Sequence, residues 1–353
     1  MKRQNLLPYF LLIQIILIPF FGLFHEMVER WYSNGLYPII SKSLRMLFGN
    51  IPFSVGDLLY FVLIVFGIKW IWTNRKSWNT HWKNNILKIV SCFSVIYFAF
   101  HLLWGFNYHR QPLFEKMKIE RDYTDADLLL FTKKLIAKTN AIQLEITQNK
   151  NSKIVFPYSQ EQVFTMNLNG YRTLANEYPF FNYSELSAKK SLFSLPLTYM
   201  GFGGYLNPFT NEAQVNYLLP MYHSPTTSCH EMAHQMGYAS ESECNFIGFM
   251  ASVKNKDLYF KYSGYSFALR YSLANWQVRN KAVYKQLVQT VHPGILKNYD
   301  ESDAFWKTYE TPVETGFHLF YDTFLKWNQQ KDGMEGYSKF VNLMVNYYKN
   351  KPL

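Results

Sequence analysis

Long apolar runs near the N-terminus stand out from the mixed hydrophobic and polar pattern of the rest of the chain. They cover residues 6–24, 53–72 and 86–106. A helix needs about 20 mostly apolar residues to cross the hydrocarbon core of a bilayer, and each run is long enough. We therefore predict that residues 1–106 are a membrane anchor with three transmembrane helices.

Charged residues beside these runs predict the orientation of the anchor. Lys2 and Arg3 precede the first run, and Arg75, Lys76 and Lys83 lie between the second and the third. Basic residues tend to stay on the cytoplasmic side. No small-x-small cleavage site follows the first run, so we expect an uncleaved span. With three spans, the predicted protein is a multi-pass protein of the cell (inner) membrane whose C-terminal domain is extracytoplasmic.

The pattern in residues 107–353 predicts one domain that is mostly helical. Apolar residues recur at helical spacing in residues 123–146, 161–178, 262–273, 275–291, 317–328 and 337–348. Pro293 is expected to end the fourth of these helices. Glu212–Tyr217 alternates as a strand does, after a turn at Asn207–Thr210. The predicted fold class is therefore mainly α, with N-terminal transmembrane helices and a small β-hairpin or edge strand.

Charge and composition narrow the classes of partner. The formal net charge is +11 and 19% of the residues are aromatic. A basic chain can bind nucleic acid, but this sequence has no basic helix, zinc knuckle or arginine-rich tract. We attribute the lysines to solvated surface, some of it facing anionic lipid headgroups. The expected partner is the lipid bilayer, and no nucleic-acid partner is expected.

The strongest chemical signal is the HExxH motif at His230-Glu231-Met232-Ala233-His234. Residues four apart on a helix lie on one face, so both imidazoles can reach a single metal ion. Glu231 can contact a metal-bound water without being a ligand. The apolar residues inside the motif favour a partly buried helix over a solvated one with two surface histidines. This pattern is typical of a zinc hydrolase with one Zn2+ per chain.

A second helix is expected to follow the motif and to supply a carboxylate. Gly237 predicts the end of the first helix. Ser240-Glu241-Ser242-Glu243 has the S-x-x-E pattern of a capping box, followed by an apolar run. Two helices joined by a short turn can fold back on one another. Either Glu241 or Glu243 could then complete the metal site, and spacing alone does not separate them.

The segment resembles the active site of gluzincin-type zinc metallopeptidases, where a second helix carries a Glu ligand and, four positions later, an acidic or amide residue that supports a ligand histidine. The resemblance implies a zincin-like domain with metal ligands His230, His234 and Glu241 (alternative third ligand Glu243), catalytic Glu231 and the supporting residue Asn245. Asn245 stands where many gluzincins have Asp. Together with the upstream spans, the motif also resembles an uncharacterised Bacteroidota family of membrane-anchored, zinc-peptidase-like proteins, known as a domain of unknown function.

The sequence thus predicts a membrane-anchored zinc metallohydrolase, a peptidase that cleaves peptide or protein substrates outside the cytoplasm. The alternative is a non-catalytic envelope membrane protein with a structural or vestigial metal site, against which the intact Glu231 argues. A peptidase also needs a donor for the oxyanion. Candidates by residue type are Tyr262, Tyr265, Tyr271, His318 and Tyr321. Cys229 and Cys244 flank the motif, either as a bridge or as two buried thiols.

Overall fold

The chain folds mainly into α-helices in the computed structural model, which describes residues 6–327 and 337–353. The N-terminal part contains α1 (Leu6–Gly22), α2 (His25–Met27), the π-helix η2 (Val28–Leu36), α3 (Tyr37–Phe48), α4 (Val55–Asn74), the 3-10 helix η3 (Arg75–Ser77) and α5 (Trp78–Leu103). The helices that follow are η4 (Gly105–His109), α6 (Leu113–Lys116), α7 (Asp125–Thr147), α8 (Gln160–Glu177), η5 (Pro179–Phe181), α9 (Ser194–Tyr199), η6 (Met221–His223), α10 (Ser224–Gln235), α11 (Glu241–Lys254), α12 (Leu258–Arg279), α13 (Lys281–Val288), α14 (Pro293–Tyr309), α15 (Pro312–Trp327) and α16 (Tyr337–Tyr347). The short strands are β1 (Ala188–Lys190), β2 (Gly204–Asn207) and β3 (Glu212–Val215).

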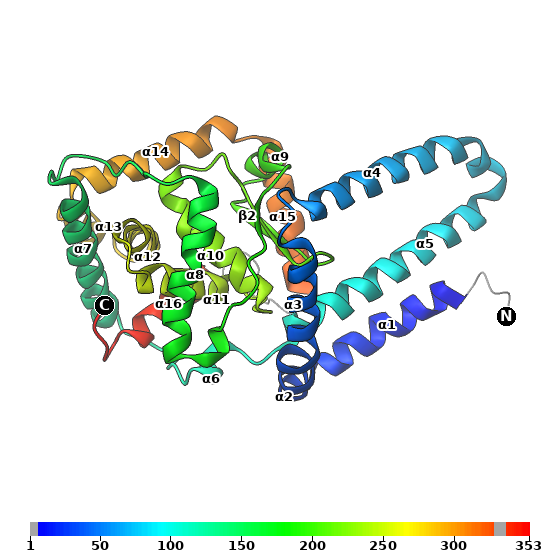
Figure 1. The fold of residues 1–353 in the computed structure, drawn as a ribbon, viewed down its shortest axis with the longest axis horizontal. Coiled ribbons are helices and arrows are strands. Elements are labelled where there is room, and N and C mark those ends of the chain that lie inside the picture. The colour runs from blue at the N-terminus through cyan, green and yellow to red at the C-terminus, as the bar shows by residue number, and fades with distance from the viewer. Residues whose placement is uncertain (1–5, 328–336) are drawn as a thin grey trace.

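Helices α1, α4 and α5 project together from one side of the helical body (Figure 1). α1 packs along α5, while α4 leads away from the body and α5 returns to it. By length and composition, the helical stretch Val55–Leu103 is able to cross a membrane, and α1 with its bent continuation His25–Phe48 makes a second candidate. Most of the large apolar side chains on α1, α4 and α5 are exposed. The division into three separate spans stays a prediction.

The small sheet has the strand order β1-β3-β2 and connects the projecting helices to the body. β2 and β3 form a hairpin, one of the two expected alternatives, and β1 runs parallel to β3 on its other side, so β3 is a central strand and not an edge strand. The carboxylate of Glu212 on β3 accepts hydrogen bonds from the backbone N–H groups of Val55 and Gly56 at 3.2 and 2.6 Å. A carboxylate is favourable at this position because the free N–H groups of a helix N-terminus carry partial positive charge. The hairpin therefore fixes the point where α4 leaves the body.

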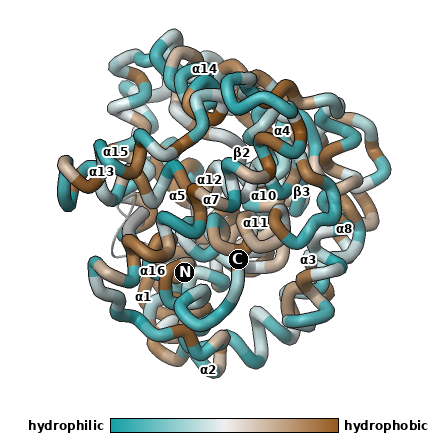
Figure 2. Tube along the Cα trace, turned by 90° about the vertical axis from the view of Figure 1, so that its left-hand side faces the viewer, coloured by the Kyte–Doolittle hydropathy of each residue, from teal (hydrophilic) through white to brown (hydrophobic). Residues whose placement is uncertain are grey.

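Helices α10 and α11 lie at the centre of the body. In the end-on view of Figure 2, both are near the middle, with α14, α8 and α2 toward the rim. α11 contributes a run of fully buried apolar residues, Phe246 to Met250, to a hydrophobic cluster shared with α7, α12 and α16. α8 crosses α11 closely at Gly170, where a β-carbon would lie only 2.0 Å from the carbonyl oxygen of Ala251. The helix that follows the HExxH segment is therefore held by close packing.

Some helix boundaries differ from the sequence prediction. Pro293 lies in the first turn of α14, where its missing N–H and fixed φ suit the start of a helix. The periodic residues 262–291 divide at Asn280, which caps α13, because α12 runs on to Arg279. Asp332-Gly333, a residue pair that predicts a turn between the last two helices, lies outside the described residues.

Candidate metal centre

The HExxH segment occupies the second half of α10. His230 and His234 lie one helical turn apart, and the helix ends at Gln235. Gly237 follows with a φ of 84°, the left-handed conformation that the sequence predicts at a helix C-terminus. A β-carbon at this position would lie 2.8 Å from Asn107 and 2.9 Å from Tyr37. Glycine is therefore required both by the backbone conformation and by the close packing around this turn.

Each imidazole of the motif is oriented by a hydrogen bond to its Nδ1 atom. His230 Nδ1 lies 2.8 Å from Asn245 Oδ1, and His234 Nδ1 lies 2.8 Å from the carbonyl oxygen of Tyr238. Because both partners are acceptors, Nδ1 carries a hydrogen in each ring. The two Nε2 atoms lie 3.1 Å apart, close enough for both to bind one metal ion. Histidines that bind metals are held in this way by an outer hydrogen bond.

The two glutamates at the start of α11 have different surroundings. Glu241 has one carboxylate oxygen 3.2 Å from His230 Nε2 and the other 3.8 Å from His234 Nε2. Glu243 instead accepts a hydrogen bond from the backbone N–H of Leu113 at 2.6 Å. The structure therefore brings Glu241, and not Glu243, to the two imidazoles.

The start of α11 also differs in detail from the predicted capping box. Ser240 is the N-cap residue, as expected, but its side chain does not cap the helix. Its hydroxyl lies 3.0 Å from that of Ser242, while Glu243 is held by Leu113. The pattern thus predicted the helix start correctly and the reciprocal side-chain contacts wrongly, because a distant backbone N–H competes for Glu243.

Glu231 is buried beside the two histidines. One possible ligand atom from each of His230, Glu231 and His234 lies within 4.8 Å of the others. Burial raises the pKa of Glu231 to about 7, although the nearby histidines lower it in part. Its Oε2 atom has no hydrogen-bond partner within the described chain. Gly204 of β2 approaches Oε1 so closely that a β-carbon would lie 2.7 Å away. A buried, unpaired carboxylate of this pKa is suited to accept a proton.

His234 and Glu241 carry opposite charges in the metal-free site. Burial lowers the pKa of His234, but Cys244 and Glu241 outweigh it and hold that pKa well above its ordinary value. Burial raises the pKa of Cys244 to about 11, so the thiol is neutral at pH 7 and Glu241 supplies the negative charge. Burial likewise raises the pKa of Glu241, but hydrogen bonds from His230 and His234 bring it well below the usual value. A cation that binds here must therefore displace a proton.

Only some of the expected oxyanion donors lie near this centre. The Tyr321 hydroxyl of α15 donates a hydrogen bond to Glu241 Oε1 at 2.7 Å. Burial, together with the Glu241 charge, raises the pKa of Tyr321 well above its usual value, so it stays protonated. His318, one turn earlier on α15, lies beside Phe202. Tyr262 donates instead to Asn298, while Tyr265 and Tyr271 pack against Phe249 and Phe340 in the core.

The last turn of α10 is held by residues from the N-terminal part of the chain, which the sequence did not predict. The indole Nε1 of Trp104, directly after α5, donates to the His234 carbonyl oxygen at 3.1 Å. Tyr37 and Ser41 of α3 donate to the Gln235 carbonyl oxygen at 2.9 and 2.8 Å. These groups satisfy carbonyls that a helix end leaves without partners. They also fix the second histidine relative to the projecting helices.

A buried ion pair secures the turn that follows α10. Arg110 donates to the Gly237 carbonyl oxygen at 2.8 Å, and its guanidinium lies 4.1 Å from the centre of the Tyr238 ring. The same guanidinium pairs with both oxygens of Glu29 at 3.0 and 3.1 Å, and Lys116 reaches Glu29 at 2.7 Å. Tyr238 provides the carbonyl that orients His234, so this pair supports the ligand geometry. Glu29 lies far from Arg110 and Lys116 in the sequence, so no local sequence pattern predicts this ion pair.

Cys229 and Cys244 are separate thiols, both fully buried. Of the two possibilities that the sequence left open, the structure has the buried thiols. Cys244 Sγ lies 3.2 Å from His234 Nδ1 and 3.1 Å from the Tyr238 carbonyl oxygen, so it packs behind the second histidine.

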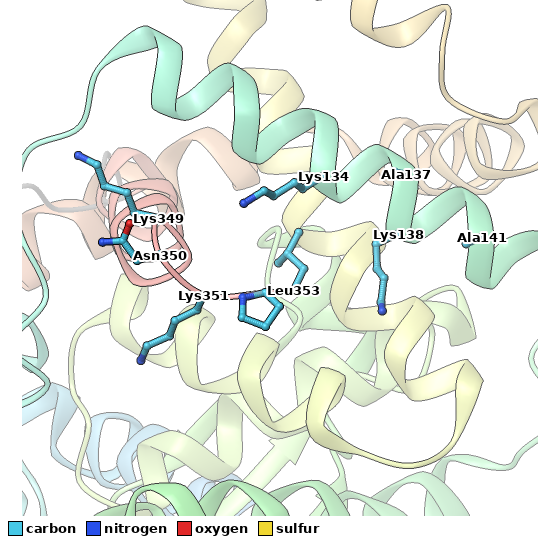
Figure 3. A pocket seen from close by; sticks show the side chains of 9 residues that line it. Lys134, Ala137, Lys138, Ala141, Lys349, Asn350, Lys351 and Leu353 are labelled. Carbon is cyan, nitrogen blue, oxygen red and sulfur yellow. The ribbon is translucent and has the colours of Figure 1, made fainter.

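An open pocket elsewhere on the body is distinct from this centre. It lies between α7 and the C-terminal residues and is lined by the lysines Lys134, Lys138, Lys349 and Lys351, with Leu353 between them (Figure 3). None of the HExxH residues or their partners lines it. Lys349 is already engaged with Asp127 at 3.3 Å. The pocket therefore adds no chemistry to the metal centre.

Comparison with known proteins gives a family but no activity. A family model described as "Protein of unknown function (DUF3810)" matches residues 32–345. No curated protein matches the chain, and no solved structure does. The match begins after α1 and includes α3, the whole HExxH segment and α15.

Proposed function

The chain belongs to the DUF3810 family of proteins of unknown function, and we propose that it is a membrane-anchored zinc metallopeptidase. The convergence of His230, His234 and Glu241 carries this proposal, with the Glu241 oxygens 3.2 and 3.8 Å from the Nε2 atoms. Two imidazole nitrogens and one carboxylate, with a fourth position for water, are the donor set of a catalytic zinc site. The resemblance to gluzincins assigns the same ligands.

The second line of support is an unsatisfied carboxylate oxygen at the centre. Glu231 is buried, and its Oε2 atom has no hydrogen-bond partner within the described chain. Unpaired buried polar groups are costly, so their persistence indicates a function. A purely structural metal site has no need for a carboxylate next to its ligands. Glu231 therefore favours catalysis over the vestigial alternative.

The proposed mechanism follows from the positions of these side chains. Zinc, when bound, supplies a Lewis acid that polarises the scissile carbonyl and lowers the pKa of water. Glu231 accepts the proton of the attacking water at its free oxygen and later passes it to the leaving amine. Asn245 and the Tyr238 carbonyl hold the two imidazoles in the required tautomer. Tyr321, which stays protonated and reaches the centre, is the candidate donor for the developing oxyanion.

The membrane assignment is proposed from the N-terminal helices. α4 has 20 residues and α5 has 26, and each is long enough to cross a bilayer separately. α1 packs along α5 and would be the third span. In Figure 1 the start of α1 lies at the end remote from the body, as does the turn η3 with Arg75 and Lys76. A cytoplasmic location of that end would make the body extracytoplasmic.

Metal content and hydrolysis, measured on the full chain in detergent, test the proposal. We expect about one zinc per chain, since a tetrahedral catalytic site needs its three protein ligands. His230→Ala and Glu241→Gln should lose the metal. Glu231→Gln should keep the metal but cleave a peptide library about 10²–10⁴-fold more slowly, because the general base is removed.

Glu243→Gln is the matched control for these changes. It makes the same chemical change on the same helix, two residues from Glu241, but its carboxylate is held by Leu113. It should retain zinc and activity. A wild-type protein that holds no zinc would overturn the proposal, and zinc loss in Glu231→Gln would overturn the assigned roles.

A further inference from the structure

Helix α15 covers the metal centre with one face and leaves an apolar face open. Tyr321 reaches Glu241, and Phe324, one turn later, packs against Phe100 of α5 and Tyr108 at ring-centre distances of 6.3 and 6.2 Å. On the outer face, Leu319 and Phe320 are 68% and 66% exposed. Val313 and Phe317 are exposed as well, and the exposed Lys326, two turns after Leu319, places a charge at the C-terminal end of the helix, where it pairs with Asp322. Exposing an apolar surface of this kind to water is unfavourable.

Helix α3 repeats this arrangement on the other side of the centre. Its inner face holds the end of α10 through Tyr37 and Ser41. Its outer face exposes Ile39 and Leu47 at 66% and 65%. The segment that contains α3 is bent by 95° from α1. In Figure 1, α3 and α15 both lie across the root of the projecting helices, where α4 and α5 meet the body.

Both helices contact α5, one of the candidate spans whose large apolar side chains are mostly exposed. Phe324 joins α15 to the last turns of α5, and α3 packs on α5 as well. Helices that cross the direction of a transmembrane helix at its end, with an apolar side turned outward, are typical of the membrane interface. The bilayer that would cover α1, α4 and α5 is therefore the occupant that fits both faces.

We propose that α3 and α15 lie in the membrane surface, and that the substrate is a polypeptide segment held close to the same bilayer by its own anchor. This inference deepens the proposed function, and its statement about the substrate rests on that function. The centre lies between the two helices, since α3 holds the His234 end of α10 and α15 contacts Glu241. With both helices in the membrane surface, the centre between them is close to segments that are anchored in the same bilayer.

Spin labels in lipid nanodiscs test the position of the two helices without any catalysis. Cys92, the exposed cysteine, is first changed to Ser, and Cys229 and Cys244 are fully buried. Single cysteines are then placed at Leu319 and Ile39 and labelled with a nitroxide. Labels in the membrane interface should collide more often with dissolved oxygen than with a water-soluble nickel chelate.

Val278→Cys is the matched control for the labels. Val278 is an apolar residue near the end of α12 and is 89% exposed, but it lies on a helix of the body. Its label should collide more often with the nickel chelate than with oxygen. If the labels at Leu319 and Ile39 behave like the one at Val278, neither helix lies in the membrane and the inference is wrong.

Anchored peptides with spacers of different length test the substrate class. The same cleavable sequence is joined to a transmembrane helix by about five or about twenty residues, which reach at most about 18 or 70 Å. The short spacer should be cleaved at least as fast as the long one, and both about 10²-fold faster than the free peptide, because the anchor raises the local concentration. Cleavage that requires the long spacer would contradict a centre at the membrane surface.

Failure of this inference is distinguishable from failure of the proposed function. If no peptide is cleaved at any spacer length, the peptidase assignment fails, and the spin labels still decide where α3 and α15 lie. If the labels lie in the membrane and only the free peptide is cleaved, the substrate class is wrong although the peptidase assignment holds.

Discussion

At the scale of single residues, the proton on His234 links the charge of the metal centre to metal binding. The pKa of His234 lies well above its ordinary value because Glu241 and Cys244 outweigh burial. The metal-free site therefore holds a proton at neutral pH that zinc must displace. We expect zinc binding to release protons and the affinity to fall as the pH falls, by about tenfold per pH unit for each proton displaced. Calorimetry in buffers of different ionisation enthalpy measures this release.

Glu241→Gln tests the cause of the raised His234 pKa separately from zinc binding. The variant removes the negative charge that faces His234, so its pKa should fall toward the value set by burial. NMR titration of the metal-free variant should show this fall. An unchanged titration would mean that Glu241 does not hold the proton on His234.

Asn245 is expected to control zinc affinity without touching the metal. Its Oδ1 accepts the hydrogen of His230 Nδ1 at 2.8 Å. Asn245→Ala should weaken zinc binding about 10–100-fold, the usual cost of losing an outer hydrogen bond to a ligand histidine. Asn245→Asp should restore it. Asn255→Ala is a matched control, because Asn255 follows the other end of the same helix and bonds to Met166. Competition with a zinc chelator measures all three.

The sequence predicted the arrangement of the two motif histidines better than the groups that support them. HExxH places two imidazoles by helix periodicity, and that geometry is local. Glu241 and Glu243 could not be separated by spacing, since the difference depends on Leu113, 130 residues away along the chain. Tyr321 was one of several equal candidates by type. Its selection depends on how α15 packs, which no local pattern encodes.

At the scale of helices and strands, the close crossing of α8 and α11 determines the position of α11. A β-carbon at Gly170 of α8 would lie 2.0 Å from the Ala251 carbonyl oxygen. Gly170→Ala should therefore force the two helices apart and lower the free energy of unfolding by about 1–3 kcal/mol, the usual cost of overpacking a core. Denaturant unfolding of the purified protein measures the change.

Gly67→Ala is the control for this helix substitution. Among the described residues, no atom outside the adjacent backbone of α4 lies within 4 Å of a β-carbon built at Gly67. Alanine there should be neutral or slightly stabilising, because it lowers the entropy of the unfolded chain. Equal destabilisation by both changes would show that the close crossing does not determine the effect of Gly170→Ala.

Helix positions were predictable from periodicity, while some ends and joints were not. α7 and α8 begin with the capping boxes of Thr124 and Ser159, close to the predicted boundaries. Pro293 was assigned to a helix end but starts α14, because proline is compatible with both places. The Glu212 contact with the start of α4 brings a strand to a helix more than 150 residues earlier. Such a contact follows from the tertiary fold alone.

At the scale of the whole molecule, the direction of the projecting helices gives a topology that can be tested. The start of α1 and the η3 turn lie at their remote end, and the body with the metal centre lies at the other (Figure 1). A reporter that is active only in the cytoplasm should therefore stay silent when fused after Leu353, and should be active when inserted next to Arg75. The reverse pattern would mean that the body is cytoplasmic.

The support of α10 by Trp104, Tyr37 and Ser41 has a consequence for how the protein is made. These groups are synthesised before the HExxH helix and belong to the part that we propose enters the membrane. A newly made chain that fails to insert would have an unfinished centre, which would protect the compartment of synthesis from stray proteolysis. We therefore expect residues 107–353, expressed alone, to bind zinc more weakly than the full chain. Equal affinity in the chelator assay would argue against such a safeguard.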